Sequence, residues 1–183
     1  MGVEKKKNKL VIGGCRSGKS GYAMALAEKS APQNRIYIAT CVPLDDEMDD
    51  RVRKHQEERD HTWQTVETPV AVAEKIRELG AHAGVILVDC LTLWVTNLVM
   101  KELTEREVFD HVADLVAASA ACPCPVIFVA NEVGMGIVPD NKLARFFRDM
   151  AGYVNQQMAS FADQVVWMVA GIPVMIKPGP EVS

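Results

Sequence analysis

The sequence predicts an α/β fold built on a doubly wound, mostly parallel sheet. Short runs of Val and Ile recur along the chain with few polar residues inside them, which is typical of parallel strands covered on both faces. Segments with helical periodicity separate these runs, so the two kinds of element alternate. With 183 residues the chain is long enough to bury one continuous core. We therefore expect a single domain over 9–183, preceded by a flexible extension at 1–8.

The expected strands are short apolar runs. KLVIGG opens the series, a turn of Pro32, Gln33 and Asn34 precedes RIYIAT, and GVILVDC is strongly apolar. PVIFVAN follows in the second half, and QVVWMVAG and PVMIK close the chain. Together these runs predict strands at 9–14, 35–40, 84–90, 125–131, 164–171 and 173–177.

The expected helices carry capping signals or apolar stripes. Thr104 and Glu107 stand at the spacing of a capping box. A long helix that starts near Pro139 would place apolar side chains three and four residues apart, at Leu143, Phe146, Phe147, Met150, Val154, Met158 and Phe161. The other helices are expected at 18–30, 44–59, 69–79, 92–102 and 105–121.

Composition and charge exclude several classes of protein. The net charge of −4 argues against a surface that binds nucleic acid by neutralising phosphates. No apolar stretch approaches the roughly 18–20 residues that cross a membrane, and the N-terminus lacks a signal pattern. The five cysteines are odd in number and lack the spacing of a zinc or redox pair. We expect a cytoplasmic protein with reduced, mostly buried thiols.

The segment GGCRSGKS carries the clearest chemistry in the chain. It matches the pattern G-x-x-x-x-G-K-[ST], with Gly13, Gly18, Lys19 and Ser20 in place between a strand and a helix. Glycines let the backbone wrap tightly, so that N–H groups and the helix N-terminus point at phosphate oxygens. Lys19 would reach the β- and γ-phosphates, and the Ser20 hydroxyl would bind Mg²⁺. Asp89, which ends a buried strand, is expected to hold Mg²⁺ directly or through water, and its alternative role is to cap the following helix.

These features predict a nucleoside triphosphate site in a P-loop NTPase (RecA-like) fold, and leave three uses of the triphosphate to compare. A regulatory GTPase is disfavoured, because Asp89 is followed by Cys-Leu-Thr and NKLA (141–144) lacks the terminal Asp of a guanine-reading motif. A small-molecule kinase fits the loop, the acidic strand and the size. A binding module without catalysis is the weakest alternative.

His55 raises a separate question. On a helix over 44–59 it would share one face with Leu44, Met48 and Val52, so it could be a buried core imidazole. Two arginines, Arg51 and Arg59, flank the same face, and a basic face suits an imidazole that attacks a phosphorus atom. Both interpretations stay open on composition alone. His61 follows the same helix and either lies on the surface or contacts a base or phosphate, whereas His82 falls in a loop and His111 lacks a phosphate-binding context.

Two further segments have open roles. NEVGMGIVP (131–139) follows a buried strand, so it lies at the carboxyl edge of the sheet, where open α/β sheets bind ligands. It is either a structural turn or a part of the active-site region, with Pro139 at the first position of the long helix. Residues 92–103, rich in Leu and Val and containing Trp94, could line a substrate surface or bury a subunit interface.

The chain resembles a known family over about 9–177. GGCRSGKS, YIAT, DDEM, RVRKHQEER, VDCLTLWVTNL and NEVGMGIVPDNKLARFFRD occur in the order and spacing of the bifunctional adenosylcobinamide kinase/adenosylcobinamide-phosphate guanylyltransferases of cobalamin biosynthesis. The resemblance implies two reactions. ATP or GTP phosphorylates the aminopropanol hydroxyl of adenosylcobinamide, and GMP then passes from GTP through a guanylyl-histidine to the substrate phosphate. The products are adenosylcobinamide-GDP and pyrophosphate.

The resemblance also implies residue roles. The guanylylated histidine falls on His55, and Lys54 stands where some relatives carry a second histidine. Asp89 stands where some relatives carry Glu, which keeps a carboxylate for Mg²⁺. The family is typically oligomeric, commonly a trimer. The implied nucleotide contacts are Gly13, Gly14, Cys15, Arg16, Ser17, Gly18, Lys19, Ser20, Ala39, Thr40, Cys41, Gln56, Glu57, Glu58, Arg59, Glu67 and Asp89.

Overall fold

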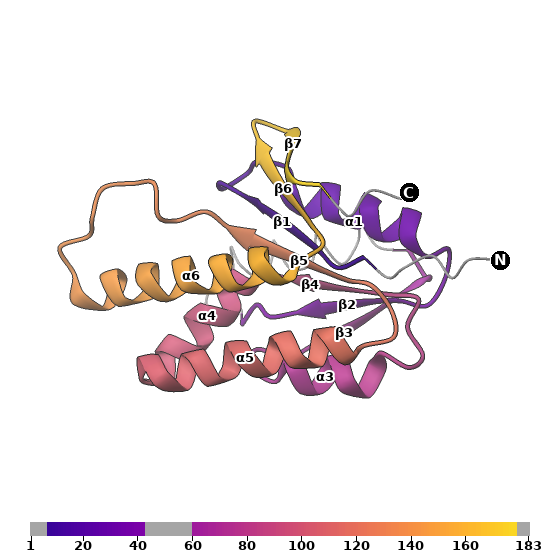
Figure 1. The fold of residues 1–183 in the computed structure, drawn as a ribbon, viewed down its shortest axis with the longest axis horizontal. Coiled ribbons are helices and arrows are strands. Elements are labelled where there is room, and N and C mark those ends of the chain that lie inside the picture. Colours follow the sequence, from indigo (N-terminus) through magenta and orange to yellow (C-terminus); the bar gives the residue numbers. More distant parts are fainter. Residues whose placement is uncertain (1–6, 43–59, 179–183) are drawn as a thin grey trace.

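The computed structural model describes residues 7–42 and 60–178. In these ranges a seven-stranded sheet has the order β3-β2-β4-β5-β1-β6-β7 (Figure 1). All neighbouring strands pair in parallel except β7, which runs antiparallel to β6. The strands are β1 Lys9–Gly13, β2 Arg35–Ala39, β3 Trp63–Glu67, β4 Val85–Asp89, β5 Val126–Asn131, β6 Gln164–Val169 and β7 Ile172–Lys177.

Helices cover both faces of the sheet, as the doubly wound prediction requires. In Figure 1, α1 lies on one face, and α3, α4, α5 and α6 lie on the other. Their bounds are α1 Lys19–Ser30, α3 Val72–Leu79, α4 Leu91–Met100, α5 Glu105–Ala121 and α6 Lys142–Phe161. The α/β prediction is therefore confirmed.

The alternation of side chains along the strands divides the core into two layers. Ile127 and Val129 of β5 pack on the α1 side, together with Ala23 and Ala27 of that helix. Phe128, between them in sequence, packs on the opposite side. This alternation fixes which strand-end side chains can meet α1 and the loop that precedes it.

Helix α4 contributes to the larger of these two layers. Trp94, Val95 and Leu98 are almost completely buried in the core of their own chain, and the Trp94 indole nitrogen donates to the Val70 carbonyl at 2.9 Å. These side chains are thus not available to line a substrate surface or a subunit interface. Met100, at the end of α4, remains 67% exposed.

The structure differs from the sequence-based expectation at β3, at the start of α6 and at Asn8. Strand β3 was not expected, because its sequence WQTVE lies at the edge of the sheet and only Trp63 is buried. Helix α6 begins at Lys142 with Asn141 as its N-cap, so the expectation that Pro139 occupies the first helical position is wrong. Asn8 is already buried and donates its backbone N–H to Asp163, one residue before the expected start of the domain.

The capping box predicted for α5 is present. The Thr104 hydroxyl accepts from the Glu107 N–H, and the Glu107 carboxylate accepts from the Thr104 N–H at 2.8 Å. None of the helices in the described ranges is long and apolar enough to span a membrane. The helix expected at 44–59 lies outside the described residues.

Candidate functional site

The loop between β1 and α1 has the shape of a phosphate cradle. Gly18 adopts the left-handed conformation with φ 85° and serves as the N-cap of α1. A Cβ atom on Gly13 would lie 2.6 Å from the Met168 carbonyl and 2.7 Å from the Ser17 hydroxyl, so a side chain has no room there. The loop therefore turns tightly into the N-terminus of a helix, the arrangement that binds phosphate through backbone N–H groups.

Lys19 folds back over this loop. Its ammonium donates a hydrogen bond of 3.0 Å to the Gly14 carbonyl. The ammonium thus lies against the backbone of the loop, where a bound phosphate would attract it.

Asp89 ends β4 and faces the same side of the sheet as the loop. Two strands away, Gly13 ends β1, with β5 between them. Side chains two residues apart on a strand point to the same face. Asp89 therefore shares a face with Leu87, and Gly13 shares a face with Val11, and both of these partners belong to the core layer under α1. The Tyr37 hydroxyl donates to Asp89 Oδ2 at 3.1 Å and orients the carboxylate. The structure therefore places the predicted carboxylate and the loop that carries the predicted lysine on the same face, at the carboxyl ends of the strands.

The ends of β2 and β3 lie beside Asp89 at this edge. The register pairs Ala39 with both Asp89 and Glu67, so the expected contacts at 39–41 and 67 are neighbours. Thr40 is fully buried, and its hydroxyl both donates to the Cys90 carbonyl at 2.7 Å and accepts from the Cys90 N–H at 2.9 Å. Thr40 therefore clamps β2 to β4, while Glu67 is exposed.

Asn97 was not among the predicted site residues, but its side chain holds the segments after β2 and β3 in place. Its side-chain NH₂ group donates to the Thr40 carbonyl at 2.8 Å and to the Pro69 carbonyl at 2.9 Å. It thereby ties α4 to the segments that follow β2 and β3. No sequence pattern could have identified it, because its partners are backbone atoms 57 and 28 residues away.

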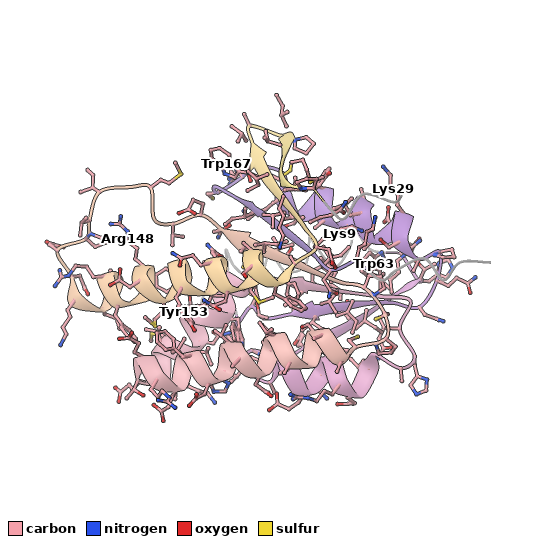
Figure 2. All side chains as sticks on the ribbon, viewed as in Figure 1. Lys9, Lys29, Trp63, Arg148, Tyr153 and Trp167 are labelled. Carbon is pink, nitrogen blue, oxygen red and sulfur yellow. The ribbon has the colours of Figure 1, made fainter. Side chains whose placement is uncertain are left out.

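The segment 131–139 also reaches the cradle. The Glu132 N–H donates to the Gly13 carbonyl at 3.0 Å, so the start of this segment is hydrogen-bonded to the first glycine of the loop. In Figure 2, Arg148 points from α6 toward this segment, and its guanidinium donates to the Gly134 carbonyl at 2.5 Å. Three apolar side chains beyond it are exposed, Met135 by 77%, Ile137 by 97% and Val138 by 64%. The segment is anchored to the cradle and presents an apolar surface.

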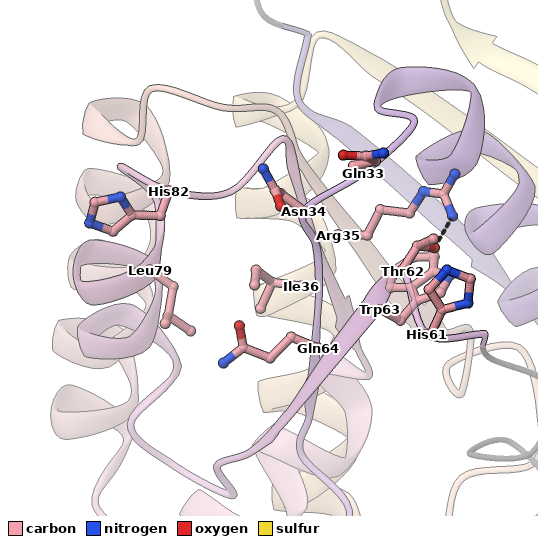
Figure 3. Close-up of a pocket in the computed structure, with 10 residues that line it drawn as sticks. All are labelled: Gln33, Asn34, Arg35, Ile36, His61, Thr62, Trp63, Gln64, Leu79 and His82. Carbon is pink, nitrogen blue, oxygen red and sulfur yellow. Dashed lines mark hydrogen bonds between the residues drawn. The ribbon is translucent and has the colours of Figure 1, made fainter.

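The described histidines lie away from the phosphate cradle. His61 and His82 line a cavity of about 520 Å³ where β2 and β3 begin (Figure 3). The cavity therefore lies at the amino ends of these strands, whereas the cradle lies at the carboxyl ends. In the same cavity the Arg35 guanidinium donates hydrogen bonds to the Ala31 carbonyl and to the Thr62 hydroxyl. His111 packs edge-on against Trp94. The expected nucleophile His55 and the expected contacts Gln56, Glu57, Glu58 and Arg59 lie outside the described residues.

The cradle, the lysine and the carboxylate together define a P-loop nucleotide-binding protein. Solved structures support this class at the level of the fold. A KaiC-like protein from Pyrococcus horikoshii OT3 aligns with a TM-score of 0.50 and 13% identity, over 88% of this chain and 70% of that chain. The flagellar accessory protein FlaH from Methanocaldococcus jannaschii aligns with a TM-score of 0.55 and 13% identity, over 94% and 79% of the two chains.

Sequence comparison assigns the family. The family model described as cobinamide kinase / cobinamide phosphate guanyltransferase matches residues 9–176. The bifunctional adenosylcobalamin biosynthesis protein CobU of Salmonella typhimurium is 45% identical over 180 residues, covering 92% of this chain and 98% of that protein. CobP of Pseudomonas aeruginosa is 39% identical over 171 residues, covering 93% and 98%. The chain belongs to the cobinamide kinase / cobinamide phosphate guanyltransferase family, which confirms the resemblance.

Proposed function

We propose that this protein catalyses both reactions of its family in cobalamin biosynthesis. It phosphorylates the aminopropanol hydroxyl of adenosylcobinamide with ATP or GTP, and then transfers GMP from GTP to the new phosphate. The observation that carries this proposal is the arrangement of the site, in which Lys19 folds over the loop that follows β1 and Asp89 ends β4 on the same face of the sheet. The site lies within the range matched by the family model.

In the first reaction the cradle binds the triphosphate. The N–H groups of the 13–20 loop and the N-terminus of α1 bind its oxygens, and Lys19 exchanges the Gly14 carbonyl for the β- and γ-phosphates. The substrate oxygen forms a bond to the γ-phosphorus while the bond to the nucleoside diphosphate breaks. Positioning and neutralisation of charge carry most of this reaction.

Ser20 and Asp89 are the residues that would bind Mg²⁺. No group of three or more His, Cys, Asp or Glu side chains that could hold a metal occurs among the described residues. One carboxylate and one hydroxyl, completed by substrate phosphates, fit Mg²⁺, which is commonly held in this way. When bound, the ion would neutralise charge that develops on the β- and γ-phosphates.

In the second reaction His55 acts as the nucleophile. Its neutral imidazole attacks the α-phosphorus of GTP, a nitrogen–phosphorus bond forms, and pyrophosphate leaves. The phosphate of adenosylcobinamide phosphate then takes the GMP and frees the histidine. Arg51 and Arg59 would bind the phosphates, and Gln56, Glu57 and Glu58, which lie between His55 and Arg59, would contact the nucleotide.

Labelling with GTP that is radioactive at the α-phosphate tests this proposal. With Mg²⁺ the protein is expected to become covalently labelled, and the label should be labile in acid, stable in base and absent from His55→Ala. His61→Ala is the matched control, because His61 lies at the amino ends of β2 and β3, away from the cradle, and it should label normally. Absence of label while GTP binds would leave the alternative function, a P-loop small-molecule kinase without guanylyl transfer.

We further propose that the working form is a cytoplasmic homo-oligomer, a trimer by analogy with its family. Strand β7 supports association, since it lies at the edge of the sheet and exposes Ile172, Val174, Met175 and Ile176. Light scattering after size-exclusion chromatography would give the mass of the oligomer.

We also propose that residues 9–183 form a single domain, which predicts one cooperative unfolding transition.

A further inference from the structure

Asn131 is the last residue of β5 and lies between the two strands that carry the site. The register pairs it with Gly13 of β1 on one side, and on the other side β5 pairs with β4 so that Val129 lies opposite Asp89. Ile127 and Val129 belong to the core layer under α1, so alternation directs Asn131 to the same face as Asp89 and the cradle.

The backbone of Asn131 is fixed from three elements. Its N–H donates to the Thr92 hydroxyl of α4 at 2.6 Å, and its carbonyl accepts from the Asn155 side chain of α6 at 3.1 Å. The next N–H, of Glu132, donates to the Gly13 carbonyl. The backbone of Asn131 is therefore held in place next to Gly13, the first glycine of the cradle.

The side-chain oxygen of Asn131 is buried and has no hydrogen-bond partner in the described part of the chain. The Ser17 hydroxyl, in the cradle itself, is likewise buried and without a hydrogen-bond partner among the described residues. Buried polar atoms are nearly always paired, and unpaired ones are costly. Both atoms lie next to Gly13, since Gly13 pairs with Asn131 and a Cβ atom there would meet Ser17. This clustering indicates that a ligand completes the pairing.

The chemistry of the oxygen narrows the choice of ligand. An amide oxygen accepts hydrogen bonds, so it cannot pair with phosphate oxygens or with the Asp89 carboxylate. Lys19 marks the place of the terminal phosphates at Gly14, one residue from Gly13. The exposed apolar side chains of Met135, Ile137 and Val138 belong to the same segment as Asn131, so a large, partly apolar substrate would approach from this side.

We propose that Asn131 is a further catalytic residue, whose side-chain oxygen accepts a hydrogen bond from the substrate hydroxyl that attacks the terminal phosphate. This inference rests on the kinase half of the proposed function. The hydroxyl oxygen bonds to the γ-phosphorus, the bond to the nucleoside diphosphate breaks, and the proton passes to solvent water. Asn131 holds the hydroxyl in line but takes no proton, because an amide oxygen is not a base at neutral pH.

Asn131→Leu tests the inference, since leucine has the same branched shape and the same number of side-chain heavy atoms but no acceptor. Asn8→Leu is the matched control at the other end of β5, where the Asn8 side-chain oxygen accepts from the Val126 N–H at 3.0 Å. The control leaves a buried N–H unpaired and should lower Tm by about 3–8 °C. Asn131→Leu removes an atom that has no partner within residues 7–42 and 60–178, so its Tm should stay within about 2 °C of wild type or rise.

The kinetic measurements use adenosylcobinamide and γ-labelled GTP with Mg²⁺. For Asn131→Leu we expect kcat for phosphorylation to fall about 10- to 100-fold, while the KM for adenosylcobinamide changes less than about threefold. The Kd of a non-hydrolysable GTP analogue and the covalent labelling by α-labelled GTP should also stay within about threefold of wild type, since neither requires the hydroxyl.

Three results would overturn the inference while leaving the proposed function in place. They are unchanged phosphorylation by Asn131→Leu, a Tm loss equal to that of Asn8→Leu, and a nucleotide Kd weakened tenfold or more. The last would make Asn131 a nucleotide ligand instead. Wild-type protein that does not phosphorylate adenosylcobinamide would overturn the proposed function itself, and with it this inference.

Discussion

The hydroxyl of Tyr37 donates a hydrogen bond of 3.1 Å to Oδ2 of Asp89. The two side chains come from neighbouring strands, β2 and β4, and both face α1. Tyr37 is buried, and its ring packs edge-on against Trp63 of β3 at a centroid distance of 6.2 Å. The orientation of the carboxylate therefore depends on an aromatic pair formed between β2 and the edge strand β3.

Tyr37→Phe tests the importance of this orientation. The substitution keeps the ring and its packing but removes the hydrogen bond to Asp89. Partners of metal ligands commonly change metal affinity 10- to 100-fold when lost, so the Mg²⁺ concentration for half-maximal phosphorylation should rise about tenfold. A Mg²⁺ titration at saturating triphosphate measures it.

Tyr153→Phe is the control for that experiment. Tyr153 of α6 stacks on Phe109 at 4.0 Å, far from the cradle in sequence and on the other face of the sheet (Figure 2). Its Mg²⁺ dependence should match wild type. A wild-type Mg²⁺ dependence in Tyr37→Phe would show that the hydroxyl does not tune a metal ligand.

Lys19→Met should nearly abolish phosphorylation. The substitution keeps most of the aliphatic stem and removes the charge that binds the terminal phosphates. Loss of one such electrostatic contact commonly costs about 10²- to 10³-fold, and we expect kcat/KM to fall by at least about 100-fold. Lys29→Met changes an exposed lysine in the last turn of the same helix and should leave kcat/KM unchanged. An equal loss of kcat/KM in the two variants would contradict the proposal that Lys19 binds the terminal phosphates.

The cysteines should differ sharply in reactivity. Burial raises the pKa of the Cys90 thiol to about 12, with a further contribution from the Asp89 charge. Because the folded-state pKa lies far above neutral pH, the thiol stays protonated and unreactive. Cys15 is exposed in the cradle. Iodoacetamide at pH 8, followed by peptide mass spectrometry, should modify Cys15 and spare Cys90, and bound GTP should protect Cys15. Modification of Cys90 in folded protein would contradict the burial argument.

Most of the fold was predictable because buried parallel strands have an unmistakable pattern. The strands β1, β2, β4 and β5 are continuous apolar runs, since each is covered on both faces. Strand β3 lacks this signal because it lies at the edge, where polar residues are tolerated. The start of α6 was misplaced for a different reason, since proline and asparagine both carry start signals within three residues.

The candidate site was predictable only in part. The cradle and Asp89 follow from local sequence, since a motif and a strand end can be read along the chain. Tyr37, Asn97 and Asn131 could not be found in that way, because their roles depend on the order and register of strands. Register is a tertiary property, and a residue at a strand end gains its neighbours only when the sheet assembles.

Asn141→Ala measures where α6 begins. The Asn141 side-chain oxygen accepts from the N–H groups of Leu143 and Ala144, at 2.8 Å and 3.2 Å, so it satisfies two donors of the first turn. Its loss should cost about 1 kcal/mol of unfolding free energy. In a chain of this size, that corresponds to a Tm lower by about 2–4 °C, which calorimetry can resolve.

The sign of that effect separates the two possible helix starts. If the helix began near Pro139, Asn141 would lie inside the first turn, and alanine would be neutral or stabilising because its helix propensity is higher. With Asn141 as the cap, alanine destabilises the protein, while Asn141→Asp keeps an acceptor at the same position and should retain the wild-type Tm. A Tm for Asn141→Ala at or above wild type would therefore contradict the observed start at Lys142.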